Sequence, residues 1–170
     1  MSKAALKKAL KDLERDSLSE IIMELYEARP EAKEYLEFWL NPDAEEELQK
    51  YRKKIFKLFF MSEGKTRRSP AFTELKTHTK YFISLGIEPE KVSDLMLYIL
   101  ETYRDWLALR KHVVSHHPRF DKLYGETAAY IETAGLEDLY NIRLSRIKEE
   151  TEDIFERGNT RITSRWRWRW

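Results

Sequence analysis

The last residues of the chain combine arginine and tryptophan in an alternating pattern that can bind an anionic or aromatic ligand. In an extended strand, alternation places the indoles on one side and the guanidinium groups on the other. Such a strand suits an anionic lipid surface, a single-stranded nucleic acid or a partner's sheet edge. Self-association, packing onto the rest of the chain and no function at all stay open. The alternating residues are Arg165, Trp166, Arg167, Trp168, Arg169 and Trp170.

A second basic segment precedes a helix predicted to start at Pro70. Lys65, Arg67 and Arg68 lie close to Ser69, which we expect to cap that helix. The free amides and the dipole of a helix N-terminus suit phosphate or carboxylate. The plainer interpretation is a solvated loop, and the segment lacks the glycines of a nucleotide-hydrolysing Walker loop. Three further side chains extend the positive charge along the helix: Lys76, His78 and Lys80.

Histidines gather near the end of the longest predicted helix, residues 89–114. His112 and His116 have the i, i+4 spacing at which two imidazoles can share a metal ion. On a continuous helix they would align with Asp94, Glu101 and Asp105, and the opposite face would be apolar. That stripe therefore points to solvent if the helix packs normally. Histidine is also favourable near a helix C-terminus through the dipole alone.

The sequence contains none of the nucleophile, zincin or dinucleotide motifs that would indicate a catalytic site. We therefore predict no catalytic residues and no cofactor, and an enzyme is the less favoured interpretation. The chain has no cysteine, which excludes disulfides, thiolate metal sites and cysteine nucleophiles.

Prolines and glycines divide the chain into amphipathic segments that we expect to be helical. Proline is tolerated at the first helical position, and glycine at the left-handed residue after the last. The predicted helices cover residues 3–13, 17–28, 30–40, 42–61, 70–85, 89–114, 118–134 and 136–157. The expected starts are Pro30, Pro42, Pro70, Pro89 and Pro118, and the expected stops are Gly64, Gly86, Gly135 and Gly158.

These segments predict an all-α fold of about eight helices, arranged as helical hairpins in a bundle or a short solenoid. Two caps are expected near the N-terminus: Ser2 for the first helix and a capping box of Ser17 with Glu20 for the second. The apolar second half of the fourth helix predicts that it is central. No sheet is expected before Gly158. We predict one helical domain over residues 1–158 and an extended Arg/Trp-rich tail over residues 159–170.

The absence of cysteine and of a signal peptide predicts a cytoplasmic protein, and the charge balance gives no sign of nucleic-acid binding. The 170 residues carry a net charge of +1, and the last ten hold four arginines and no acid, so residues 1–160 carry −3. The N-terminus lacks the apolar core of a signal peptide. No transmembrane segment is expected, because no run approaches the roughly 18 apolar residues that a membrane span needs. Peripheral membrane contact through the tail stays open.

Several segments of the first hundred residues resemble an uncharacterised family of bacterial proteins classed as a domain of unknown function. The resemblance covers about residues 2–101 and implies a bacterial, mainly helical protein. It supplies no activity and no functional residues. The segments that carry it are LSEIIMELY (18–26), PEAKEYL (30–36), NPD (41–43), LGIEP (85–89) and DLMLY (94–98).

The sequence favours a non-enzymatic interaction module that binds an unidentified protein partner or a second copy of itself. The first alternative is an anion or nucleic-acid binder that uses the 65–69 loop and the Arg/Trp tail. The second is a metal-dependent enzyme built on His112, His116 and nearby acids.

Overall fold

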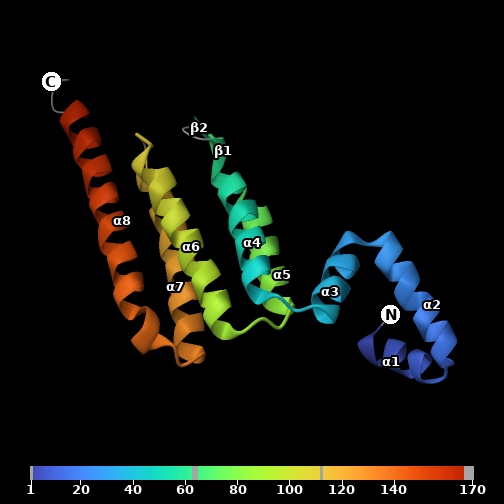
Figure 1. The fold of residues 1–170 in the computed structure, drawn as a ribbon. Helices are drawn as coiled ribbons and strands as arrows, with labels where there is room; N and C mark the ends of the chain where they lie inside the picture. The colour runs from blue at the N-terminus through green and yellow to red at the C-terminus, as the bar shows by residue number, and fades with distance from the viewer. Residues whose placement is uncertain (1, 63–64, 112, 167–170) are drawn as a thin grey trace. The chain divides into compact units, whose positions relative to one another are not determined.

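The computed structural model describes residues 2–62, 65–111 and 113–166, and it confirms the all-α prediction (Figure 1). A short 3₁₀ turn, η1 (Val114–His116), and two strands, β1 (Phe60–Ser62) and β2 (Lys65–Thr66), interrupt the helices. The helices are α1 (Lys3–Lys11), α2 (Arg15–Ala28), α3 (Pro30–Leu40), α4 (Ala44–Phe59), α5 (Phe72–Ser84), α6 (Pro89–Ala108), α7 (His117–Thr133) and α8 (Glu137–Trp166).

Contacts divide the chain into two compact units, residues 1–43 and residues 44–170. The first unit holds α1, α2 and α3, and α2 packs against α3. The hydroxyl of Tyr26 donates a hydrogen bond to the Glu37 carboxylate across this pair at 2.9 Å. None of the residues in these three helices is buried, so this unit has little core of its own.

One of the two predicted N-terminal caps is confirmed. The Ser2 hydroxyl accepts a hydrogen bond from the Ala5 amide at 3.2 Å and caps α1. The capping box of Ser17 with Glu20 is wrong, because α2 already begins at Arg15. The interior serine Ser19 instead donates to the Arg15 carbonyl at 3.0 Å, as hydroxyls within helices do.

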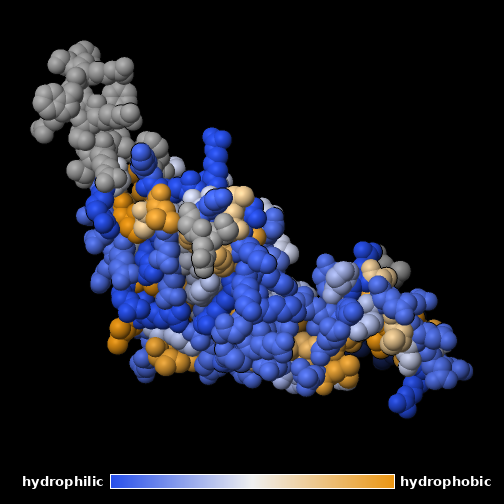
Figure 2. Space-filling model, turned by 45° about the horizontal axis from the view of Figure 1, so that its top comes forward, coloured by the Kyte–Doolittle hydropathy of each residue, from blue (hydrophilic) through white to orange (hydrophobic). Residues whose placement is uncertain are grey.

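The second unit is a two-layered array of helices centred on α6. The array has α4, α6 and α8 in one layer and α5 and α7 in the other, and successive helices run antiparallel (Figure 1). Four helices, α4, α5, α7 and α8, pack around α6. Half of its twenty residues are buried, so α6 and not the predicted fourth helix is central. The side of the molecule that Figure 2 shows is mainly hydrophilic, and its hydrophobic side chains lie in small patches.

Three of the five predicted proline starts and two of the four predicted glycine stops are confirmed. Pro30, Pro89 and Pro118 lie in first turns as predicted, and Gly86 and Gly135 follow α5 and α7 with φ of 72° and 67°. The other two prolines, Pro42 and Pro70, each lie two residues before their helix begins. Gly64 lies outside the described residues.

Two predictions about the middle of the chain are wrong. The helix from Pro89 ends at Ala108, not at residue 114, and the reversal that follows lets Val113 pack into the core, with 1% of its surface exposed. Strands β1 and β2 form a short antiparallel hairpin where no sheet was expected. Strands of two or three residues are too short to show an alternating pattern in the sequence.

Helix α8 continues through Trp166, which corrects two further predictions. The helix does not stop at Gly158, and residues 161–166 are helical rather than extended. Residues 167–170 lie outside the described part of the chain. Gly158 is buried within α8, where a Cβ atom would lie 2.7 Å from Cγ2 of Val113. The glycine therefore allows close packing and does not end the helix.

Replacing Gly158 with alanine is expected to lower the free energy of unfolding by up to about 2 kcal/mol. The added methyl group clashes with the buried Val113, and this cost exceeds the roughly 1 kcal/mol that alanine gains over glycine in a helix. Urea unfolding followed by circular dichroism measures the change. Gly125→Ala in α7 is the matched control, because its Cβ would have open space. That variant should be stabilised, and the same sign for both variants would contradict the role assigned to Gly158.

Candidate functional site

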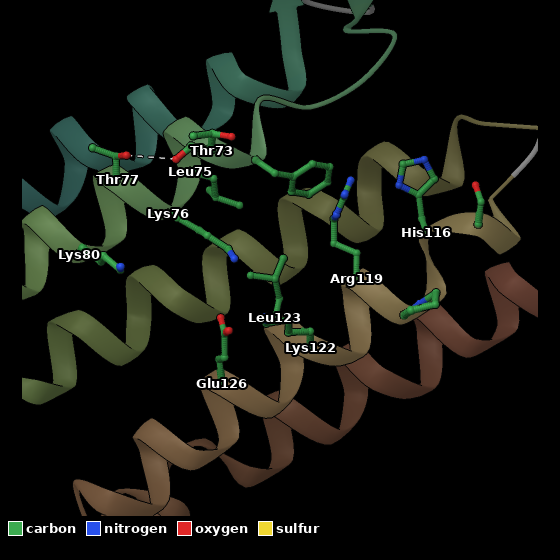
Figure 3. Close-up of a pocket in the computed structure, with 13 residues that line it drawn as sticks. Thr73, Leu75, Lys76, Thr77, Lys80, His116, Arg119, Lys122, Leu123 and Glu126 are labelled. Carbon is green, nitrogen blue, oxygen red and sulfur yellow. Dashed lines mark hydrogen bonds between the residues drawn. The ribbon is translucent and has the colours of Figure 1, made fainter.

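A basic groove opens between α5 and α7, in the layer that has only two helices. Its cavity measures about 860 Å³ and is drawn in Figure 3. Lys76 and Lys80 line it from α5, and Arg119 and Lys122 line it from α7. Only one carboxylate, that of Glu126, lies among the lining residues that the structure describes. The groove therefore carries a clear excess of positive charge.

Helical spacing explains why these side chains share the groove. On α5, Lys76 and Lys80 are four residues apart, and on α7, Arg119, Lys122 and Glu126 follow at i, i+3 and i+7. Residues at these separations lie on one face of a helix. Lys76 points from α5 across the groove toward α7 (Figure 3).

The floor of the groove is apolar. A second cavity of about 310 Å³ shares Leu75 and Leu123 with the first, and it adds Met96 and Ile99 of the central helix α6. The two cavities share five lining residues, so they form one continuous depression. A ligand in it would meet aliphatic side chains below and ammonium groups at the rim.

Three lysines of the rim are available to a ligand. Lys76, Lys80 and Lys122 are exposed, and they make no hydrogen bond or ion pair with another described residue. Arg119 is held differently, because its guanidinium lies 4.2 Å from the centre of the Phe72 ring on α5. This cation–π contact joins the two walls at one end of the groove.

Beside that end, His116 forms a neutral hydrogen-bonded pair with Tyr103. Burial, together with the nearby charges of Arg119 and Arg110, lowers the pKa of His116. Burial also raises the pKa of Tyr103, so its hydroxyl keeps its proton. The hydroxyl lies 2.8 Å from Nδ1 of His116, and we assign it as the donor. The positive charge of the groove therefore comes from its lysines and Arg119.

The structure places the predicted basic loop differently from the sequence. Lys65, Arg68 and Ser69 are exposed, but Ser69 does not cap α5, whose N-cap residue is Ala71. Arg67 has a structural role, because its Nε donates to the Lys57 carbonyl at 2.7 Å. The predicted Ser69 cap is therefore wrong, and the anion site of the loop stays a prediction.

The loop and the described start of the tail, residues 159–166, belong to different elements of the second unit. Strands β1 and β2 follow α4, whereas α8 packs against the other side of α6 and against α7 (Figure 1). Arg165 and Trp166 belong to α8. The remaining four predicted tail residues, Arg167, Trp168, Arg169 and Trp170, lie outside the described residues.

The predicted acid and histidine stripe is not present as one helical face. His116 lies in η1, beyond the end of α6, and His112 lies outside the described residues. Asp94 and Glu101 face α8 instead of solvent, and both bind Arg143. His116 therefore does not continue α6, and the predicted metal pair of His112 with His116 stays a prediction.

A different histidine is surrounded by acids. Nδ1 of His117 lies 2.8 Å from the Asp121 carboxylate, and Nε2 lies 3.1 Å from the Glu152 carboxylate. The sequence analysis missed this group, as it missed Arg119 and Lys122. Helical spacing along residues 117–126 could have revealed both groups. It places Arg119 and Lys122 on one face of the helix and His117 with Asp121 on another.

Comparison with known proteins gives a family but no activity. No curated protein and no solved structure matches the chain. A model of a family of unknown function (DUF6155) matches residues 1–159, which include both units up to the buried Gly158. The resemblance noted in the sequence is thereby confirmed, and the chain belongs to this family of unknown function.

Proposed function

We propose that this protein is a non-enzymatic interaction module that binds an acidic partner protein in the groove between α5 and α7. The observation that carries the proposal is the combination of a cationic rim and an apolar floor. An acidic amphipathic helix matches both, because its carboxylates can meet the lysines while its apolar face covers the floor. Consistent with the expected compartment, we place this function in the bacterial cytoplasm.

Nucleic acid is the less favoured ligand for this groove. Sequence-independent binding of single strands relies on aromatic platforms on which bases stack. Among the described lining residues of the two cavities, Phe72 is the one phenylalanine, tyrosine or tryptophan, and the Arg119 guanidinium covers its ring. The His116 ring, which also lines the groove, is engaged by the Tyr103 hydroxyl. The aliphatic floor fits leucine or methionine side chains better than bases.

In the part of the chain that the structure describes, none of the helices has the length and hydropathy that a membrane span needs.

Binding of a labelled peptide that repeats glutamate and leucine at helical spacing tests the proposal. Fluorescence anisotropy should show saturable binding that weakens as salt is added, because screening reduces the attraction between exposed charges. The double variant Lys80→Glu, Lys122→Glu should bind at least about tenfold more weakly, since like charges then face each other. A scrambled peptide of the same composition should also bind more weakly.

A matched charge reversal separates the groove from the basic loop. Lys65→Glu with Arg68→Glu makes the same change in net charge outside the groove and should leave peptide affinity nearly unchanged. A chain ending at Gly158 tests the tail in the same assay. If the loop variant and the groove variant lost the same amount of peptide affinity, the groove would be rejected as the binding site. Tighter binding of oligo-dT than of the peptide would favour the nucleic-acid alternative.

A further inference from the structure

A histidine and two carboxylates converge where α7 meets α8, outside the lining of the groove. His117 begins α7, Asp121 follows one turn later, and Glu152 faces them from α8. One nitrogen or oxygen donor from each of the three lies within 4.8 Å of the other two. The group joins two helices that are neighbours in the fold.

The positions of these donors are fixed by the helices that carry them. The i, i+4 spacing places His117 and Asp121 on one face of α7. The His117 ring packs against Phe155 of α8, with 4.5 Å between the ring centres. Phe155 is buried, so it limits the orientations that the imidazole can adopt. Metal sites in helical bundles are built in this way, from side chains on facing helices.

We propose that His117, Asp121 and Glu152 bind a divalent transition-metal ion of the zinc type. Two carboxylates and a neutral imidazole balance the charge of such an ion. An imidazole ligand favours zinc, iron, copper or nickel over magnesium and calcium, which prefer oxygen ligands alone. Bonds of about 2.0–2.2 Å require the three donors to approach a common centre. Asp121 and Glu152 contact different nitrogens of His117, so one of these two contacts gives way when a ring nitrogen binds the ion.

The exposure of the group provides an entry path for the ion. The side chains of His117, Asp121 and Glu152 keep 37%, 49% and 36% of their surface exposed. Three protein ligands leave a fourth position for water in a tetrahedral site. The ion would also tie the start of α7 to α8, one residue away from His116, which lines the groove.

Metal titration of the whole 170-residue chain, first freed of metal with a chelator, tests the site. Isothermal titration calorimetry with Zn²⁺ should show one site near unit stoichiometry, and Co²⁺ should give the visible spectrum of a low-coordinate complex. His117→Ala should weaken Zn²⁺ binding by at least about tenfold, because even the loss of a group that only hydrogen-bonds a ligand typically costs about 10–100-fold. The matched control is His78→Asn, which removes another imidazole and should leave the binding unchanged.

A second variant separates a metal site from a simple ion-paired contact between the helices. Glu152→Gln keeps a side chain that can hydrogen-bond His117 but is a much poorer metal ligand, so it should lose affinity while remaining folded. Zn²⁺ should raise the melting temperature of the wild-type protein, and raise it much less in this variant. Failure of Zn²⁺ to bind the wild type, or equal binding by the wild type and both variants, would overturn the proposal. Neither result depends on peptide binding in the groove.

Discussion

Replacing Trp106 with alanine is expected to lower the free energy of unfolding by about 3–5 kcal/mol. Trp106 lies on the central helix α6 and exposes 1% of its surface. Its indole N–H donates to the Arg67 carbonyl at 2.9 Å and so ties the β1–β2 hairpin to the core. Alanine would leave a cavity and would remove the donor from a carbonyl beside it. Urea unfolding followed by circular dichroism gives the free energy.

The same substitution at an exposed tryptophan is the control. Trp39 on α3 exposes 68% of its surface, so Trp39→Ala should change the free energy by about 0.5 kcal/mol or less. Trp106→Phe should fall between wild type and Trp106→Ala, because it keeps an aromatic ring but not the N–H donor. If Trp106→Ala lost no more stability than Trp39→Ala, the indole of Trp106 would not be packed as described.

Replacing Arg143 with alanine is expected to cost about 2–3 kcal/mol of stability. Arg143 of α8 binds Glu101 through two nitrogens, at 2.8 and 2.9 Å, and binds Asp94 at 2.6 Å. Removing one partner of a buried pair costs about 3–5 kcal/mol. About a quarter of the Arg143 side chain is exposed, so solvent screening reduces the expected value. Chemical unfolding of wild type and variant at pH 7 measures the difference.

At acid pH the free energies of unfolding of Arg143→Ala and wild type should differ by less than at pH 7. Although burial opposes ionisation of Glu101, hydrogen bonding and charge from Arg143 lower its pKa below the ordinary 4.5. A carboxyl group with a lowered pKa stabilises the fold above its unfolded pKa and loses that contribution as the pH falls further. The difference should therefore be full at pH 7 and shrink below 4.5. Arg157→Ala is the control, because Arg157 bonds within its own helix. A difference that does not change with pH would contradict the ion-pair account.

The sequence predicted the parts of the fold that depend on neighbouring residues. Pro89 and Pro118 mark helix starts because a fixed φ suits the first turn, and Gly86 and Gly135 mark stops because they adopt positive φ. Gly158 was misinterpreted because a glycine needed for close packing looks identical in the sequence to one that ends a helix. Only the approach of Val113, 45 residues earlier, distinguishes the two cases.

The sequence predicted only part of each candidate site, because the sites also depend on contacts between residues that are far apart in the chain. Lys76 and Lys80 were recognised as a positive stretch, but Arg119 and Lys122 join them only because α5 and α7 both pack on α6. The spacing of His117 and Asp121 is local, whereas Glu152 arrives from the next helix. Helical spacing reveals which residues share a face, but it cannot reveal which faces meet.

The alternating arrangement of helices in the second unit has a consequence for how the chain folds. The main contacts join helices that are consecutive or one apart along the chain, as in α6 with α7 and α4 with α6. Most contacts in the chain join residues fewer than 12 positions apart, and helical proteins rich in such local contacts fold within microseconds to milliseconds. The unit can therefore grow outward from α6 by adding one helix at a time. Such growth requires no early contact between α4 and α8, the two outer members of the same layer.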